Sequence, residues 1–259
     1  MEFFDSVMGS AAGVIEGSLE YGNLYPALAS WTFYTPFAYV CLLGFAFLFR
    51  EWCPNFKIGP TAQYWHNMFL AIQSIFLVFL LNVAYWDIGR IIGTGVFSID
   101  PFFSNRRFES KLLEPIISIF LLSKIYEWFD TVILVINKKP LLLLHVWHHS
   151  STYVSFASGL YCYSKFYIGY LNAILHVAMY LFYAKVKWIK PFAKYITITQ
   201  IIQLFGGSIL NIYSLIDNPD EFHPLTRKYA IINCFMTTTY WLLFMQFYFK
   251  KYKKVDKSD

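Results

Sequence analysis

The chain is poor in charge: only 14% of its 259 residues are Asp, Glu, Lys or Arg, whereas 57% are hydrophobic and 21% are aromatic. Its mean hydropathy is +0.45, and a soluble domain of this length has no need for so much apolar surface. The sequence therefore predicts a polytopic membrane protein with no nucleic-acid partner.

Several signatures of common enzyme classes are missing. The sequence contains no GxSxG nucleophile elbow, no glycine-rich nucleotide loop and no HExxH zinc motif. Its four cysteines have no CxxC spacing and indicate neither a zinc knuckle nor a disulfide framework, although one bridge between Cys162 and Cys234 stays open. No cleavable signal peptide is evident, and no internal repeat indicates a transporter built from duplicated halves.

Apolar runs of about 20 residues, the length that a bilayer core demands, recur seven times. We expect the fold to be an all-α polytopic membrane protein with seven transmembrane helices in one domain, 1–259. The expected spans are roughly 27–49, 63–85, 112–137, 141–161, 166–184, 195–216 and 227–249.

Basic residues divide unevenly between the two sets of connections that seven spans create. One set holds thirteen, including Lys138, Lys139 and the lysines of the tail 250–259, and the other holds seven. By the positive-inside rule the richer set is cytosolic. We therefore expect the N-terminal segment 1–26 to be lumenal and the basic tail to be cytosolic.

Ionisable side chains are costly in hydrocarbon, so those inside the spans point to function. His145, His148 and His149 lie in an apolar run, and the offsets i, i+3 and i+4 place them on one side of a helix. Similar spacings give polar stripes on three other spans: Lys124, Glu127, Asp130 and Thr131; Asn172, His176, Met179, Tyr180 and Tyr183; Thr197, Gln200 and Gln203.

These polar groups share one depth. Counted from the predicted cytosolic ends, they lie roughly 6–15 Å into the bilayer. The other half of the bundle, in stretches such as 116–122 and 155–160, is almost purely apolar. The pattern predicts a polar reaction chamber near a lysine-rich mouth, suited to an amphiphile with an anionic head and a long hydrocarbon tail. His66 and His223 lie near span ends and are expected to be interfacial.

Three chemistries fit such histidines. With Glu127 and Asp130 they would furnish one zinc or iron site, as in membrane desaturases or hydroxylases, although these enzymes use more histidines than the six present here. A desolvated imidazole favours its neutral form and serves as a nucleophile or base towards an activated acyl group. In a transporter the same groups would only bind and release a solute.

The order and spacing of the four polar motifs resemble those of the ELO family of very-long-chain fatty acid elongases. The motifs are Lys124-x-x-Glu127-x-x-Asp130-Thr131, His145-x-x-His148-His149, Asn172-x-x-x-His176-x-x-Met179-Tyr180-x-x-Tyr183, and Thr197-x-x-Gln200-x-x-Gln203. The likeness covers roughly 124–205 and is weaker elsewhere. Phe182 departs from the tyrosine that is common in the family.

The resemblance implies a 3-oxoacyl-CoA synthase that condenses acyl-CoA with malonyl-CoA in the endoplasmic reticulum membrane. It also implies seven helices, six of them forming a barrel around an acyl tunnel, and no metal or other cofactor. His148 would carry the acyl chain as an acyl-imidazole, His176 would assist the second half-reaction, and His145 and His149 would orient His148 or bind malonyl thioester.

Supporting and substrate-binding roles follow from the same resemblance. Lys124, Glu127, Asp130 and Thr131 would support the histidines, and Asn172, Tyr180, Gln200 and Gln203 would contact the malonyl or thioester groups. Lys185, Lys187 and Lys190 would attract the phosphates of CoA. A ketoacyl-CoA reductase, a dehydratase and an enoyl reductase would complete the cycle, saturated or monounsaturated chains are the expected substrates, and a homodimer is an open option.

Overall fold

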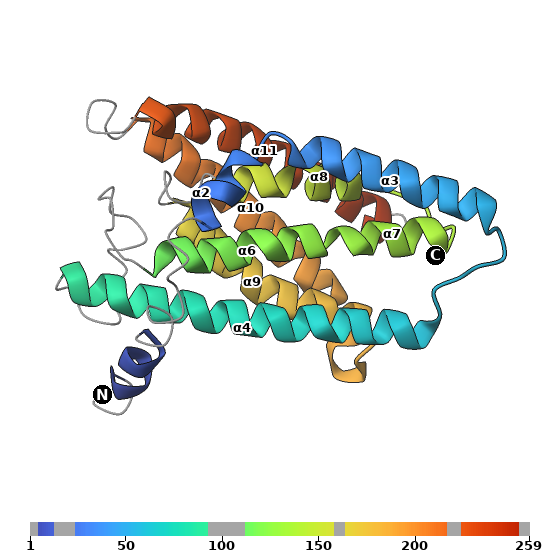
Figure 1. Cartoon of the computed structure of the whole chain (residues 1–259), viewed down its shortest axis with the longest axis horizontal. Coiled ribbons are helices and arrows are strands. Elements are labelled where there is room, and N and C mark those ends of the chain that lie inside the picture. Colours follow the sequence, from blue (N-terminus) through green and yellow to red (C-terminus); the bar gives the residue numbers. More distant parts are fainter. Residues whose placement is uncertain (1–4, 13–23, 93–111, 158–163, 217–223, 254–259) are drawn as a thin grey trace.

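The computed structural model describes residues 5–12, 24–92, 112–157, 164–216 and 224–253. Within these ranges the regular elements are all helices (Figure 1). They are α2 (Leu24–Ser30), α3 (Thr35–Trp52), α4 (Pro60–Ile92), α6 (Leu113–Tyr126), α7 (Trp128–Ile136), α8 (Leu143–Ala157), α9 (Ser164–Tyr183), the 3₁₀ segment η2 (Lys187–Phe192), α10 (Ala193–Ile216), α11 (Pro224–Tyr248) and the π-helical segment η3 (Phe249–Lys253).

The prediction of an all-helical membrane protein is confirmed. The stretches Pro60–Asp87, Lys187–Tyr213 and Arg227–Tyr252 are long and apolar enough to cross a bilayer, and Ile168–Tyr183 is a shorter apolar helix. Each of the seven predicted spans overlaps a described helix. The count of seven crossings stays a prediction, as do the sides assigned to the N-terminal segment and the tail. Cys162 and His223 lie outside the described residues.

One predicted span is not continuous, because the helix expected over 112–137 is interrupted at Glu127. The amide of Asp130 donates to the carbonyl of Glu127 at 3.1 Å, an i to i+3 bond, and the hydroxyl of Ser123 donates to the carbonyl of Phe120 at 2.6 Å. Such local tightening ends α6 and starts α7 one residue later. The interruption lies in the middle of the polar stripe.

The helices follow one another in space as neighbours around the bundle. Contacts join α4 to α9, α9 to α10, α10 to α11, α11 to α8, α8 to α6, and α6 back to α4, while α3 packs outside against α7 and α8. Gly207 of α10 lies so close to α9 that an added Cβ would meet the side chain of Ile168 at 3.0 Å, so a larger residue there would require that side chain to shift.

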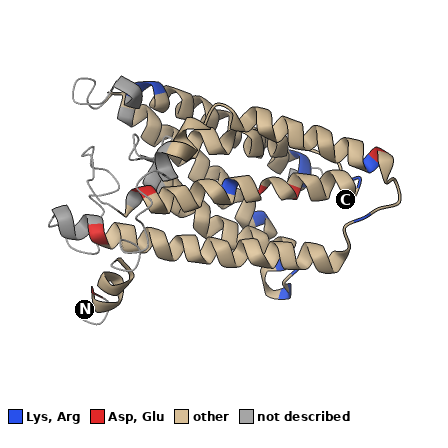
Figure 2. Ribbon diagram, in the orientation of Figure 1, with Lys and Arg blue, Asp and Glu red and all other residues tan. Residues whose placement is uncertain are grey.

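Two tight turns close helices at the same end of the bundle. Lys138 after α7 and Lys185 after α9 have φ angles of 54° and 61°, a left-handed conformation that usually belongs to glycine. The amides of Lys139 and Val186 bond back to the carbonyls of Leu134 and Leu181, at 2.9 and 3.1 Å. These turns let α8 and η2 start directly beside the preceding helix, at the end where Figure 2 shows lysines on the connections.

The far half of the bundle is less apolar than the sequence predicted. The hydroxyl of Ser155 donates to Asn233 at 3.0 Å, and Thr237 accepts hydrogen bonds from Ser208 at 3.0 Å and from Asn211 at 3.4 Å. All five side chains are buried. Ser208 and Asn211 on α10, and Asn233 and Thr237 on α11, are spaced i, i+3 and i, i+4, so each pair shares a helix face. Interhelical hydrogen bonds of this kind join helices where apolar burial gains little.

Candidate active site

A cavity of about 440 Å³ lies among α4, α7, α8, α9, α10 and α11. It sits towards the end of the bundle at which α4, α8 and α10 begin and α7, α9 and α11 end. Its walls hold most of the predicted site residues: His145, His148, His149, His176, Asp130, Asn172, Gln200 and Gln203. The polar stripes of four spans therefore face one space, as their spacing and shared depth indicated.

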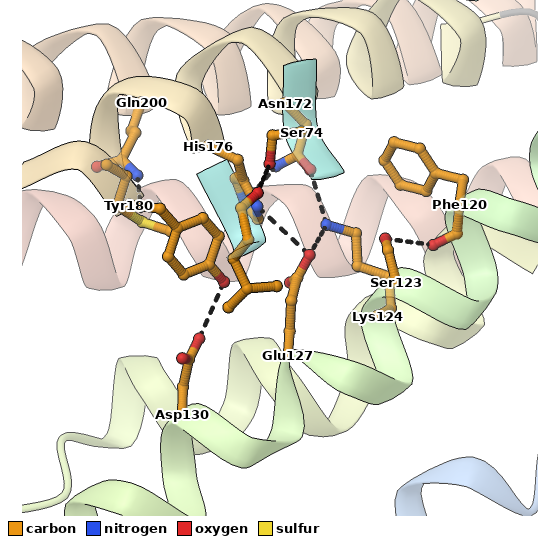
Figure 3. Close-up of polar contacts among 12 residues, drawn as sticks. Ser74, Phe120, Ser123, Lys124, Glu127, Asp130, Asn172, His176, Tyr180 and Gln200 are labelled. Atoms are coloured by element: carbon orange, nitrogen blue, oxygen red, sulfur yellow. Dashed lines mark hydrogen bonds and ion pairs between the residues drawn. The ribbon is translucent and has the colours of Figure 1, made fainter. Parts of the chain in front are cut away.

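Beside this cavity, four side chains form a closed ring of polar contacts (Figure 3). The ammonium of Lys124 donates to Glu127 Oε1 at 2.8 Å and to Asn172 Oδ1 at 3.0 Å. The amide of Asn172 lies 3.2 Å from His176 Nε2, and His176 Nδ1 lies 3.4 Å from the same oxygen of Glu127.

This ring fixes the imidazole of His176. With Nδ1 protonated towards the carboxylate and Nε2 accepting from the amide, each of the four contacts in the ring joins one donor to one acceptor. Lys124 and Glu127 are only 2% and 3% exposed, and two such charges remain buried because each neutralises the other. The second carboxylate oxygen, Glu127 Oε2, is buried and has no hydrogen-bond partner among the described residues.

The next two residues of the stripe hold two other histidines. Asp130 places Oδ1 2.7 Å from His66 Nε2 and accepts the hydroxyl of Tyr180 on Oδ2 at 2.9 Å. The hydroxyl of Thr131 lies 2.8 Å from His145 Nε2 and 2.9 Å from the hydroxyl of Tyr39. The segment from the junction of α6 and α7 into α7 therefore positions an imidazole on each of three other helices: Glu127 on α9, Asp130 on α4 and Thr131 on α8.

His148 and His149 are different, because no described side chain hydrogen-bonds either ring. The ring of His148 contacts those of His149 and Tyr240, at centroid distances of 5.5 and 5.1 Å. His149 Nδ1 is buried and has no hydrogen-bond partner in the part of the chain that the structure describes. The backbone carbonyl of His149 accepts from the indole of Trp128 at 3.0 Å, which fixes α8 rather than the rings. Both imidazoles line the cavity with nitrogens available to a ligand.

The glutamines on α10 make weaker contacts. The amide of Gln200 points to Met179 Sδ at 3.6 Å, as Figure 3 shows, and the amide of Gln203 donates to the carbonyl of Ile168 at 3.1 Å. Both side chains reach the cavity wall together with Thr197 and Phe182. The amide nitrogen of each glutamine thus joins α10 to α9, and no described residue donates a hydrogen bond to either side-chain oxygen.

Seven predicted residues do not line the cavity. Four of them lie behind its wall and contact lining residues: Lys124, Glu127, Thr131 and Tyr180. The other three are the lysines between α9 and α10. Lys185, Lys187 and Lys190 are exposed on the connection between α9 and α10 and do not line the space. Lys251 of η3 does line it, with its ammonium 5.3 Å from the ring centroid of Phe247. The lysine turn lies close by, since Tyr183 before it and Ala193 after it are both lining residues.

The structure also adds residues that the sequence reasoning missed. His66, predicted to be interfacial, is a wall residue paired with Asp130, and Gln63 and Asn67 flank it in the lining. The spacing 63, 66 and 67 repeats the i, i+3, i+4 pattern of the histidine motif, so the signal was present. Tyr39 and Tyr240 lie in apolar runs and carried no such signal.

The donor geometry gives little support to a metal site. Across the described ranges, no three His, Cys, Asp or Glu side chains are grouped so that they could hold a metal ion. His145 Nε2 and both ring nitrogens of His176 already face protein groups. The arrangement fits chemistry performed by the imidazoles themselves.

Comparison with known proteins decides the family. A model of the ELO: GNS1/SUR4 family matches residues 24–259. The chain belongs to the ELO family. This ELO chain is 30% identical to fatty acid elongase A of Dictyostelium discoideum, over 89% of the chain and 84% of that protein.

Relatives from two other organisms match a shorter part of this ELO chain. It is 33% identical to fatty acid elongase 3 of Trypanosoma cruzi, over 52% of the chain and 48% of the relative. It is 32% identical to very long chain fatty acid elongase 3 of Homo sapiens, over 52% of each protein. These two matches span about half the length of the relatives. The predicted resemblance to the ELO family is confirmed.

Proposed function

We propose that the protein catalyses the condensing step of fatty acid elongation, as a very-long-chain 3-oxoacyl-CoA synthase. Elongation itself follows from membership of the ELO family and from relatives named fatty acid elongases. In the proposed reaction an acyl-CoA and malonyl-CoA give a 3-ketoacyl-CoA, free CoA and carbon dioxide.

One observation carries the proposal: some imidazoles in the cavity have ring nitrogens in hydrogen-bond contact with protein groups, whereas others have no hydrogen bond from a described side chain. His145 and His176 have ring nitrogens engaged by Thr131, Asn172 and Glu127. The ring of His148 faces the same cavity without a hydrogen bond from a described side chain. A nucleophile needs an available lone pair, so His148 is the residue that we assign as the acyl carrier.

The chemistry proceeds in two halves. A nitrogen of His148 bonds to the acyl carbon and the carbon–sulfur bond breaks, which gives an acyl-imidazole and CoA thiol. Malonyl-CoA then loses carbon dioxide, and its new carbanion attacks the acyl-imidazole to release the 3-ketoacyl-CoA. His176, fixed by its ring of contacts, and His149, Asn172, Gln200 and Gln203 would orient the malonyl thioester.

The contacts between helices support a barrel in the bilayer. The closed series of neighbours formed by α4, α9, α10, α11, α8 and α6 matches six helices around a tunnel, with α3 outside as the seventh span. The acyl tail would extend from the cavity into the far half of the bundle. We assign the protein to the endoplasmic reticulum membrane, with the N-terminus lumenal and the cavity mouth and C-terminus cytosolic.

Phosphates of CoA would meet the lysines at this mouth. Lys251 lines the cavity, and Lys185, Lys187 and Lys190 lie exposed on the neighbouring connection. Clustered cations attract polyanions over several ångströms, so they need not line the wall to assist binding. The substrates would be saturated or monounsaturated acyl-CoAs, no metal or other cofactor would be needed, and separate reductases and a dehydratase would complete the cycle.

The decisive experiment supplies palmitoyl-CoA alone to purified protein. We expect release of one CoA per active site and a mass increase of one acyl group on the peptide that contains His148. Added malonyl-CoA should then yield carbon dioxide and 3-ketoacyl-CoA, with or without a chelator. Undiminished condensation by His148→Ala would overturn the assignment of the nucleophile, and a requirement for oxygen and reductant would favour a metal oxygenase.

A further inference from the structure

His66 lines the cavity and contacts the carboxylate of Asp130, as His176 contacts that of Glu127. The proposed condensation assigns no role to His66. Its side chain is 10% exposed and lines the cavity. Nε2 lies 2.7 Å from Asp130 Oδ1, and the ring of Tyr126 stacks on the imidazole at 5.6 Å with an interplanar angle of 28°. Two elements therefore fix the plane and the tilt of this ring.

Asp130 is itself fixed, as Figure 3 shows for its contact with Tyr180. The hydroxyl of Tyr180, a residue that is 0% exposed, donates to Asp130 Oδ2 at 2.9 Å. Both carboxylate oxygens are therefore committed, one to each partner. With Nε2 turned to the carboxylate, Nδ1 is the nitrogen of His66 that has no hydrogen bond from a described residue. A carboxylate behind one nitrogen stabilises the ring when the other gains a proton.

The depth of His66 matches that of His148. His66 is six residues into α4 and His148 five residues into α8, so both lie about 8–9 Å from the helix starts at this end. Both face one cavity. A thioester whose acyl carbon meets His148 therefore has its sulfur at a level that His66 can reach.

The leaving group needs a proton. An alkyl thiol has a pKa of about 8.5, so CoA that departs as a thiolate takes up a proton at neutral pH. A thiolate also leaves faster when it is less basic or when an acid protonates it. Since the chamber is desolvated, that proton is best supplied by a fixed donor beside the sulfur.

We propose that His66, held by Asp130, is the general acid that protonates the sulfur of the departing CoA, which rests on the proposed acyl transfer to His148. As the nitrogen–carbon bond to His148 forms, the carbon–sulfur pair goes to sulfur and the Nδ1 proton of His66 follows it. The acylated ring of His148 releases its proton to water, and His66 takes one from water, so this half-reaction changes no net charge.

The test compares leaving groups in the absence of malonyl-CoA. Single-turnover thiol release is measured with palmitoyl-CoA and with a palmitoyl thioester of an aromatic thiol, whose low pKa removes the need for an acid. We expect His66→Gln to slow release from palmitoyl-CoA about 10- to 100-fold and release from the aromatic thioester less than about threefold. Asp130→Asn should show the same selectivity to a smaller degree.

Tyr64→Phe is the matched control, because Tyr64 lies exposed on the same helix as His66 and does not line the cavity, so both rates should stay unchanged. Equal slowing of both thioesters by His66→Gln would show a packing role, and unchanged rates would show no role; either result overturns the proposal. Wild-type protein that forms no acyl-enzyme with either thioester would instead overturn the proposed acyl transfer.

Discussion

Two walls of the cavity differ in how their polar groups are satisfied. On the α6–α7 wall, Lys124, Glu127, Asp130 and Thr131 each contact a side chain on another helix, at 2.7–3.4 Å. On the α8 wall, His148 and His149 have no side-chain hydrogen bond from the described residues. The difference teaches that the first wall supplies preorganisation and the second supplies reactivity. A reactive group that stays free needs neighbours that hold everything else in place.

The largest expected effect comes from substitutions on the α8 wall. His148→Ala should lower condensation more than about 1,000-fold, because no acyl-imidazole forms. His149→Ala should cost less, about 10- to 100-fold, since it removes a neighbour rather than the carrier. Both rates are measured as 3-ketoacyl-CoA formed from palmitoyl-CoA and malonyl-CoA. A larger loss in His149→Ala than in His148→Ala would exchange the two roles.

The next largest effect comes from breaking the ion pair between Lys124 and Glu127 on the α6–α7 wall. Glu127→Gln leaves the ammonium of Lys124 buried without its counter-charge, which costs about 3–5 kcal/mol of stability. We expect a clear fall of the thermal midpoint in detergent, together with a loss of condensation because His176 loses its carboxylate.

The double variant Lys124→Met, Glu127→Gln serves as the control for this prediction. With neither charge left buried, it should regain much of the thermal midpoint but not the activity. If activity returned with stability, the ring would only stabilise the bundle and would not orient His176.

A smaller effect is expected at Thr131, whose hydroxyl links the α6–α7 wall to His145 on the α8 wall. Thr131→Val keeps the shape but removes the hydroxyl between His145 and Tyr39, at a cost of about 1–3 kcal/mol for the groups left unpaired. Condensation should fall several-fold with little change in the KM for acyl-CoA. Tyr39→Phe removes only one of the two links and should fall between this variant and the wild type. Equal activity in all three proteins would separate His145 from the mechanism.

The smallest effect is expected at the mouth of the cavity, where Lys251 lies outside both walls. Lys251→Gln should raise the KM for acyl-CoA two- to fivefold at low ionic strength and leave kcat unchanged, because an exposed cation contributes weakly and is screened by salt. Lys228→Gln, exposed at the other end of α11, is the matched control and should change nothing. A salt-independent rise in KM would indicate a packing role for Lys251.

Sequence could predict the chamber because its parts follow helical spacing. His145, His148 and His149, and likewise Glu127, Asp130 and Thr131, share a face by their offsets alone, and the structure brings both groups to one place. The same spacing would have found Gln63, His66 and Asn67, but the position of His66 near a span end favoured an interfacial role.

Other features depend on contacts between helices, which spacing does not contain. Nothing along the chain shows which histidine Asp130 holds, or that Tyr39 completes the bond network of Thr131. The interruption at Glu127 arises from a single tightened turn that leaves the apolar pattern intact. Lys185, Lys187 and Lys190 were chosen by their charge, whereas the course of η3 decides that Lys251 reaches the wall.

The stripe on α6 and α7 has a consequence for how this protein can change over generations. Because Glu127, Asp130 and Thr131 each hold an imidazole on a different helix, a small rotation of α7 would displace three rings together. Substitutions in the stripe and in its partners should therefore be strongly epistatic, with effects on activity that do not add. Variation would be inherited most easily as matched sets of residues, and this one helix would be among the slowest parts of the chain to drift.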